Sequence, residues 1–381
     1  MRQILCLLVI SGAAASAAMA GDTVVYTDTR QSDGSLGGYV RYAGDNGSGI
    51  AFTYGAGIRL ADIKRGPGGS TNFVVSEGPL TLPPNPTQGT GHIYALNNLD
   101  TAATSTVIST GGQMWNPIGL RYNAASNSVL SLDNISAGSP PQVVRGLYGV
   151  NYSTGTQSLL QQERVAIAGV SNPTPEGRAW HEGGSYLVES PLGNGDYYVM
   201  STTGGRFVGP YLGSPNRNVS SLIWKVSVNG SATAATFTET VDTASAAFTR
   251  SGDALTNFNY TDFRGLTANS GTNTLYTTST FYGLIMAIQL DGAGNFVSSS
   301  IVLSGLDAPE AIEFDVSTNT LVFSELGTRS LRRVNLDGSG LTTIASDVFV
   351  RGITFTPGII PTPGAASALA LAGLAAMRRR R

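Results

Sequence analysis

Few side chains in this sequence have the type and spacing that catalysis or metal binding requires. The two histidines, His92 and His181, stand far apart, and neither lies in a His-Glu-x-x-His or His-x-His pattern that would bind zinc. Cys6 is the only cysteine. It lies in a segment that we expect to be removed, so the mature protein would have neither a thiol nucleophile nor a disulfide. No Gly-x-Ser-x-Gly sequence marks a serine nucleophile.

One local cluster has side chains that could form a wall of a ligand pocket. Trp180, His181 and Glu182 bring an aromatic ring, an imidazole and a carboxylate together. Neighbouring residues on a strand point to opposite faces, so His181 cannot share a face with both of the others. The alternative interpretation is a packed tryptophan beside two solvated polar residues at the edge of a sheet.

Acidic residues at strand ends provide the candidate metal ligands. Glu310 and Asp315 carry oxygen atoms of the kind that calcium prefers. The sequence has no twelve-residue calcium loop, and Asp291 and Asp337 precede glycine at hairpin turns, where turn geometry explains them. We therefore expect no obligatory cofactor; if a metal binds, we expect calcium at Glu310 and Asp315.

The composition indicates which elements must position these side chains. The 381 residues are 41% hydrophobic and only 13% charged, and they include 48 glycines, a balance typical of many short strands with little helix. Five of the 23 basic residues lie in the two end segments, which leaves 18 against 25 acidic residues. A mildly acidic body does not suit a phosphate backbone, so we expect no nucleic-acid partner.

A repeat of constant spacing organises the body of the chain. Three segments, beginning at Pro117, Phe263 and Pro309, align without gaps as a strand, a polar turn and a second strand. The turns carry an asparagine at the same offset: Asn127, Asn273 and Asn319. The last two copies start 46 residues apart, a length typical of a four-stranded propeller blade. We predict an all-β fold in which residues 21–358 form a β-propeller of six blades, with seven as the alternative.

A β-sandwich or jelly roll is the competing architecture, because it is also rich in glycine and turns. A sandwich would not need the same offsets to recur at this spacing. The run from Ala308 to Ser339 also resembles the YWTD repeat of low-density-lipoprotein-receptor and TolB-like propellers, although Val322-Phe323-Ser324-Glu325 stands in place of the signature tetrad. The resemblance implies a propeller with a central channel, the place where propeller lactonases hold calcium.

The beginning of the chain has the pattern of a signal peptide. Arg2 is followed by the apolar run Ile4 to Ile10 and by Ala18-Met19-Ala20, which matches the basic, apolar and cleavage regions of an export signal. We therefore expect residues 1–20 to be removed during export. The alternative is a buried N-terminal helix.

The end of the chain has the pattern of a sorting signal over residues 361–381. Pro361-Thr362-Pro363 precedes the apolar run Ala365 to Met377, which stops at Arg378 to Arg381. As a helix, thirteen residues would span roughly 20 Å, less than a ~30 Å hydrocarbon core. The segment resembles the PEP-CTERM signal, with threonine in place of the usual glutamate. The resemblance implies an exosortase-type processing enzyme, transient membrane contact through a short apolar helix, and a location outside a Gram-negative-type cell. The alternative is an ordinary amphipathic C-terminal helix.

These patterns favour an exported, envelope-sorted propeller that binds extracellular matrix or polysaccharide without catalysis. The alternative is a calcium-dependent extracellular hydrolase or lactonase that uses the propeller channel. A third class, a matrix-packing protein without a specific ligand, would have no concave polar site.

A propeller must join its first and last blades, because open sheet edges promote aggregation. The last strand, which begins at Gly352, is followed by Pro357, so its sheet needs further strands from elsewhere. The β-branched segment near residues 22–28 is the expected donor. We expect it to pair in the same sheet as Leu331–Leu336 or Leu341–Ala345.

Overall fold

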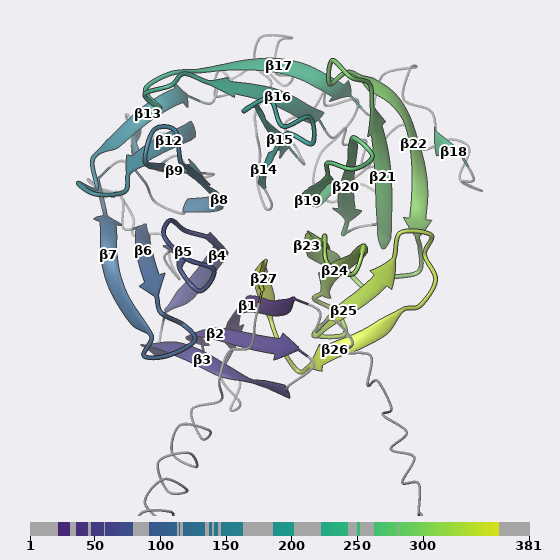
Figure 1. Ribbon diagram of the computed structural model, residues 1–381, viewed down its shortest axis with the longest axis horizontal. Helices are drawn as coiled ribbons and strands as arrows, with labels where there is room; N and C mark the ends of the chain where they lie inside the picture. Colours follow the sequence, from purple (N-terminus) through teal and green to yellow (C-terminus); the bar gives the residue numbers. More distant parts are fainter. Residues whose placement is uncertain are drawn as a thin grey trace, which may run out of the picture.

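Six sheets, each built on four antiparallel strands, stand around one central axis in the computed structural model (Figure 1). The structure describes residues 22–30, 36–44, 47–56, 58–78, 91–112, 114, 117–133, 137–138, 141–143, 146–162, 186–201, 222–242, 250–251, 263–280 and 282–357. Each sheet is one blade of a β-propeller. The prediction of an all-β propeller with six blades is therefore confirmed, and seven blades and the sandwich are wrong.

Each blade runs from an inner strand beside the axis to an outer strand at the rim. In that order, blade 1 holds β27 (Val350–Thr356), β1 (Thr23–Arg30), β2 (Leu36–Gly44) and β3 (Gly47–Ala56). Blade 2 holds β4 (Arg59–Arg65), β5 (Phe73–Gly78), β6 (His92–Asn97) and β7 (Thr104–Thr110). Blade 3 holds β8 (Pro117–Asn123), β9 (Ser128–Asp133), β12 (Gly146–Asn151) and β13 (Gln157–Gln162).

The other three blades follow in chain order. Blade 4 holds β14 (Leu187–Glu189), β15 (Tyr197–Ser201), β16 (Leu222–Val228) and β17 (Ala235–Asp242). Blade 5 holds β19 (Phe263–Asn269), β20 (Thr274–Ser279), β21 (Leu284–Leu290) and β22 (Phe296–Leu303), with the short strand β18 (Arg250–Ser251) parallel to β22 at the rim. Blade 6 holds β23 (Pro309–Asp315), β24 (Thr320–Glu325), β25 (Ser330–Asn335) and β26 (Thr342–Ser346). The short strands β10 (Ala137–Gly138) and β11 (Pro141–Val143) form a separate two-stranded sheet.

Within the described residues, no helix is long and apolar enough to cross a membrane. The segments predicted as signal peptide and as sorting signal, with its apolar helix, lie outside the described residues. The strands from Thr23 to Thr356 fall inside the range expected for the propeller body.

The asparagines of the repeat have a backbone role in the turn that follows the inner strand. Asn127, Asn273 and Asn319 have φ angles of 48°, 53° and 54°. Asparagine tolerates this left-handed conformation better than other residues with a side chain, because its short polar group can hydrogen-bond locally. The repeated asparagine therefore marks a turn that reverses the chain from the inner strand into the second strand of the blade.

The core lies between neighbouring blades. Ile312, Phe314 and Phe323 of blade 6 share a buried cluster with Tyr276 and Ile285 of blade 5. The rings of Phe314 and Tyr276 stack with their centroids 6.4 Å apart. Phe314 and Phe323 therefore pack between two successive blades.

The Phe323→Ala substitution should destabilise the protein by about 3–5 kcal/mol, because Phe323 is completely buried and alanine would leave a cavity. Denaturant unfolding monitored by circular dichroism measures this loss. A change below about 1 kcal/mol would mean that the ring does not contribute to the packing between the blades. Val297→Ala is a suitable control, because that side chain is 56% exposed.

The two ends of the described chain close the ring together. β1 pairs with β27 along its length, from Thr23 opposite Thr356 to Tyr26 opposite Ile353. The prediction that the N-terminal segment completes the last sheet is confirmed, but the predicted partner strands are wrong. Leu331–Leu336 and Leu341–Ala345 fall in β25 and β26, which already belong to the complete blade 6, so the donor pairs with β27 instead.

Candidate functional site

A cavity of about 610 Å³ opens at one end of the central channel. All six inner strands contribute to its wall through residues at their carboxyl ends or just beyond, among them Lys64, Arg121, Val188, Thr267, Glu313 and Thr354. Aromatic side chains lie beside these polar residues: Tyr122, Phe314 and Phe355. Every blade contributes to this concave site, and polar and apolar groups both line it. Cavities of this size are where proteins usually bind small ligands.

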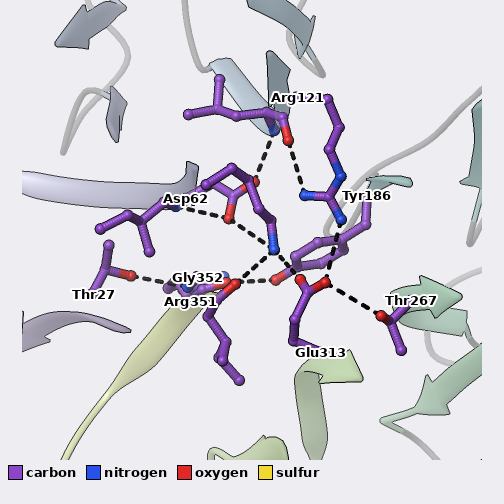
Figure 2. Close-up of polar contacts among 12 residues, drawn as sticks. Thr27, Asp62, Arg121, Tyr186, Thr267, Glu313, Arg351 and Gly352 are labelled. Atoms are coloured by element: carbon purple, nitrogen blue, oxygen red, sulfur yellow. Dashed lines mark hydrogen bonds and ion pairs between the residues drawn. The ribbon is translucent and has the colours of Figure 1, made fainter. Parts of the chain in front are cut away.

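An ion-pair network forms the floor of this cavity (Figure 2). The Lys64 ammonium donates hydrogen bonds to Glu313 Oε2 and, at 2.7 Å, to the backbone oxygen of Ile353. The other oxygen of Glu313, Oε1, lies 3.6 Å from Arg121 Nη2 and accepts a hydrogen bond from Thr267 Oγ1 at 3.3 Å. Side chains from β4, β8, β19 and β23 therefore meet on the axis of the propeller.

Asp62 anchors the network from the interior of the protein. Its side chain is fully buried, and its Oδ1 lies 3.9 Å from Lys64 Nζ. The backbone amides of Ile63 and Leu120 each donate a hydrogen bond to its carboxylate at 2.8 Å. Burial raises the pKa of the Asp62 carboxyl, whereas Lys64, Arg121 and the two amides oppose that rise. Asp62 thereby joins two inner strands and holds the lysine in place.

Tyr186 packs beneath the floor, next to the last inner strand. Its hydroxyl donates a hydrogen bond to the backbone oxygen of Arg351 at 2.7 Å. Burial raises the pKa of the Tyr186 phenol well above its usual value, and the carboxylates of Glu310 and Asp62 raise it further. The hydroxyl therefore remains a neutral hydrogen-bond donor at physiological pH.

Close backbone contact between β27 and β4 makes a glycine necessary at position 352. A Cβ atom there would lie 2.5 Å from Ile63 N, 2.7 Å from Asp62 Oδ1 and 2.8 Å from Asp62 Cα. The backbone amide of Gly352 also donates a hydrogen bond to Thr27 Oγ1 at 2.9 Å. The inner strand of the closing blade therefore has no room for a side chain at this point.

We expect Gly352→Ala to destabilise the protein by about 1–3 kcal/mol, because the added methyl group would push β27 away from β4. Gly292→Ala is the matched control, since a Cβ there meets nothing within 4 Å. Thermal unfolding of both variants measures the difference. Equal midpoints for the two variants would contradict the close contact between β27 and β4.

The residues predicted for a ligand pocket, Trp180, His181 and Glu182, lie outside the described residues, so that hypothesis stays a prediction. The other histidine, His92, stacks on Tyr94 with ring centroids 5.8 Å apart. No histidine or cysteine is among the described residues that line the cavity.

The predicted calcium ligands Glu310 and Asp315 sit near opposite ends of β23, and each is ion-paired. Arg351 Nη1 lies 2.7 Å from Glu310 Oε1, and Arg333 Nη2 lies 3.0 Å from Asp315 Oδ2. The described part of the chain holds no group of three or more histidine, cysteine, aspartate or glutamate side chains suited to a metal ion. Calcium binding by these two residues stays a prediction, and it would require both carboxylates to leave their arginines.

The sequence did not lead us to predict that the residues of the cavity floor form a site. Lys64 and Glu313 stand 249 positions apart, so no local motif joins them. Arg121, Thr267 and Glu313 nevertheless occupy the same position in the three aligned repeats, directly after a small residue and an aliphatic one. That alignment could have placed these three side chains on one ring around the channel.

The chain is similar to solved structures of other proteins at low sequence identity. No known protein family and no curated protein sequence matches the chain significantly. A nidogen/laminin complex structure is 12% identical, with a TM-score of 0.55 over 88% of this chain and 98% of that chain. The periplasmic gluconolactonase of Pseudomonas aeruginosa is 14% identical, with a TM-score of 0.49 over 90% of this chain and all of that chain.

The calcium-binding protein regucalcin of Agrobacterium tumefaciens is 12% identical, with a TM-score of 0.45 over 74% of this chain and 73% of that chain. The nidogen/laminin likeness supports the architecture alone, because its sequence identity is low. The chain is thus a six-bladed β-propeller with a cavity at one end of its channel.

Proposed function

We propose that this protein is an exported, non-catalytic binding propeller whose channel cavity takes a polyhydroxylated ligand such as a segment of extracellular polysaccharide. The observation that carries the proposal is the cavity itself, built by six strands over a floor of paired donors and acceptors. Charged groups held in fixed positions beside aromatic rings suit a ligand whose hydroxyl and C–H groups alternate. A matrix-packing protein without a specific ligand would not need such a cavity.

The composition of the cavity favours binding over hydrolysis. The side chains of its floor already satisfy one another: Glu313 accepts hydrogen bonds from Lys64 and Thr267, and lies beside Arg121. A general base or a metal ligand at Glu313 would have to give up these partners first. The calcium-dependent lactonase or hydrolase is the alternative, and turnover of the ligand would distinguish it from a binding protein.

Titration of the purified protein with fragments of polysaccharide from the host's extracellular matrix tests the proposal by calorimetry. We expect binding without turnover and at least about tenfold weaker binding by Arg121→Met, because charged hydrogen bonds contribute on the order of 1.5–3 kcal/mol. Arg329→Met is the control, since Arg329 is 47% exposed and pairs with Asp347 outside the cavity lining. Hydrolysis of the fragments, or of lactones in the presence of calcium, would instead establish the enzyme.

We also propose that residues 1–20 are removed during export and that the segment 361–381 acts as a PEP-CTERM-like signal. An exosortase-type enzyme would process this signal after transient membrane contact, and the product would reach the surface or the medium. The two ends of the described chain lie side by side at the cavity end, since Thr23 pairs with Thr356 and both Asp22 and Phe355 line the cavity.

Intact-mass measurement on protein from the native host tests this processing. We expect a species that starts at Gly21 and ends between Pro361 and Gly364. A surface species that retains Ala365 to Arg381 would contradict the sorting proposal and leave the binding proposal untouched.

A further inference from the structure

One side chain of the cavity floor, Arg121, has hydrogen-bonding capacity that the floor does not use. A guanidinium group carries five N–H donors. Arg121 Nη1 donates a hydrogen bond to the backbone oxygen of Leu120 at 3.1 Å. Arg121 Nη2 lies 3.6 Å from Glu313 Oε1, which is close enough for an ion pair but too long for a hydrogen bond. No other hydrogen bond joins the Arg121 side chain to the described residues, so most of its donors are unused.

The acceptors of the floor, by contrast, already have partners (Figure 2). Glu313 Oε2 accepts a hydrogen bond from Lys64, and Glu313 Oε1 accepts one from Thr267. The two oxygens of the Asp62 side chain each accept a hydrogen bond from a backbone amide. Each of these four carboxylate oxygens therefore accepts at least one hydrogen bond within the protein. The floor offers a ligand more unused donors than unused acceptors.

Burial gives the unused donors of Arg121 an energetic importance. Arg121 is only 8% exposed, and it lines the cavity of about 610 Å³. A guanidinium group that is largely removed from water loses hydration, and N–H groups without a partner do not recover that loss. A ligand atom that accepts hydrogen bonds from Arg121 would recover it.

The type of the unused groups discriminates between the functional groups of a sugar. A hydroxyl group both donates and accepts, so a sugar diol would need acceptors that already have partners in the floor. A carboxylate only accepts, and its two oxygens match the parallel donors of a guanidinium group. The floor of the cavity therefore suits a carboxylate better than a pair of hydroxyl groups.

We propose that the ligand of the cavity contains a uronate, a sugar unit that carries a carboxylate, and that Arg121 binds this carboxylate through paired hydrogen bonds. This inference rests on the proposed binding of a polysaccharide in the cavity. Glu313 does not prevent the binding of a second carboxylate, because Lys64 donates a hydrogen bond to Glu313 and so offsets its charge. Arg121 would then lie between the two carboxylates.

The net charge of the cavity lining does not by itself favour an anion. Three cations and three carboxylates line the cavity: Lys64, Arg65, Arg121, Asp22, Glu189 and Glu313. The preference for a uronate must therefore arise from the direct contact with Arg121, which makes one side chain the decisive one to substitute.

Calorimetric titration of the full chain with short oligomers of glucuronate, galacturonate and mannuronate tests the proposal. The control for each oligomer is the neutral oligosaccharide of the same linkage, in which a CH₂OH group replaces the carboxylate. We expect at least one oligouronate to bind about tenfold or more tightly than its neutral counterpart, the gain expected for a charge-assisted hydrogen bond. Its methyl ester, which keeps both oxygens but has no charge, should lose most of this preference.

Substitution of Arg121 tests whether this side chain makes the contact. Arg121→Met should bind the acidic and the neutral oligomer with equal affinity. Arg329→Met should keep the preference, because Arg329 is 47% exposed and pairs with Asp347 outside the cavity lining. If Arg121→Met does not fold, Arg121→Lys keeps the charge but loses the paired donors, and it should reduce the preference.

The outcomes separate this inference from the proposed function. If the acidic and neutral oligomers bind the unsubstituted chain equally, or fragments of the host's matrix bind and no oligouronate does, only the uronate proposal fails. If no saccharide binds at all, both proposals fail. A preference that persists in Arg121→Met would overturn the assignment of the carboxylate to Arg121. Tighter binding of a polyglutamate peptide than of any oligouronate would overturn the sugar as the source of the carboxylate.

Discussion

A chain that lacks residues 21–30 should fail to form a stable closed monomer. These residues include the whole of β1, which is hydrogen-bonded to β27 on one side and to β2 on the other. Val24, Val25 and Tyr26 are 1%, 0% and 2% exposed. Burial of such side chains contributes about 1.5–3 kcal/mol each, so their loss approaches the total stability of a typical domain, about 5–15 kcal/mol. We expect no cooperative thermal transition and oligomers in size-exclusion chromatography.

The matched control begins at Asp22 and keeps β1 intact, so it should remain monomeric and fold cooperatively. A synthetic peptide of residues 22–30 added to the truncated chain should restore a cooperative transition, because strand pairing with β27 and β2 needs no covalent link. A peptide with Val25→Asp should not do so, since it would bury an unpaired charge. A truncated chain that stays monomeric with an unchanged unfolding midpoint would show that β1 does not close the ring.

The donor strand could be predicted from sequence because its signals are local. The β-branched run near the N-terminus reads as a strand without a nearby partner, and so does the single strand before Pro357. Each of them therefore needed a strand from elsewhere to complete its sheet. The choice of partner required knowledge of which strands already had neighbours. β25 and β26 look like strands in need of pairing only until their sheet with β23 and β24 is known.

The repeat could be predicted for a similar reason. Asn127, Asn273 and Asn319 recur because the turn needs a residue that tolerates positive φ. The candidate site was harder to predict, because each blade contributes only a few residues to it. In blade 2 the repeat is also altered: Asp62 occupies the position of Gly119, Gly265 and Gly352, so the strand that brings Lys64 does not match the pattern.

The altered strand of blade 2 carries Lys64 into the floor of the cavity. Substitution of Lys64 is the second change that we expect to have a large effect. Lys64 is 5% exposed and is the described cation that contacts both Asp62 and Glu313. Lys64→Met keeps most of the side-chain volume but leaves two carboxylates without this partner. Removing one member of a buried ion pair typically costs about 3–5 kcal/mol, and we expect a loss of that size in denaturant unfolding.

A second substitution distinguishes the loss of charge pairing from the loss of packing. Glu313→Gln in the Lys64→Met background removes one of the two carboxylate charges that have lost Lys64 as a partner, while keeping the hydrogen-bond acceptor for Thr267. The double variant should therefore regain at least about 1 kcal/mol relative to Lys64→Met, a coupling of the size found for contacting residues. If Glu313→Gln instead adds its own loss to that of Lys64→Met, the two side chains act independently and the floor is not held by their ion pair. Lys225→Met is the control, since Lys225 is outside the cavity lining and should change stability by less than about 1 kcal/mol.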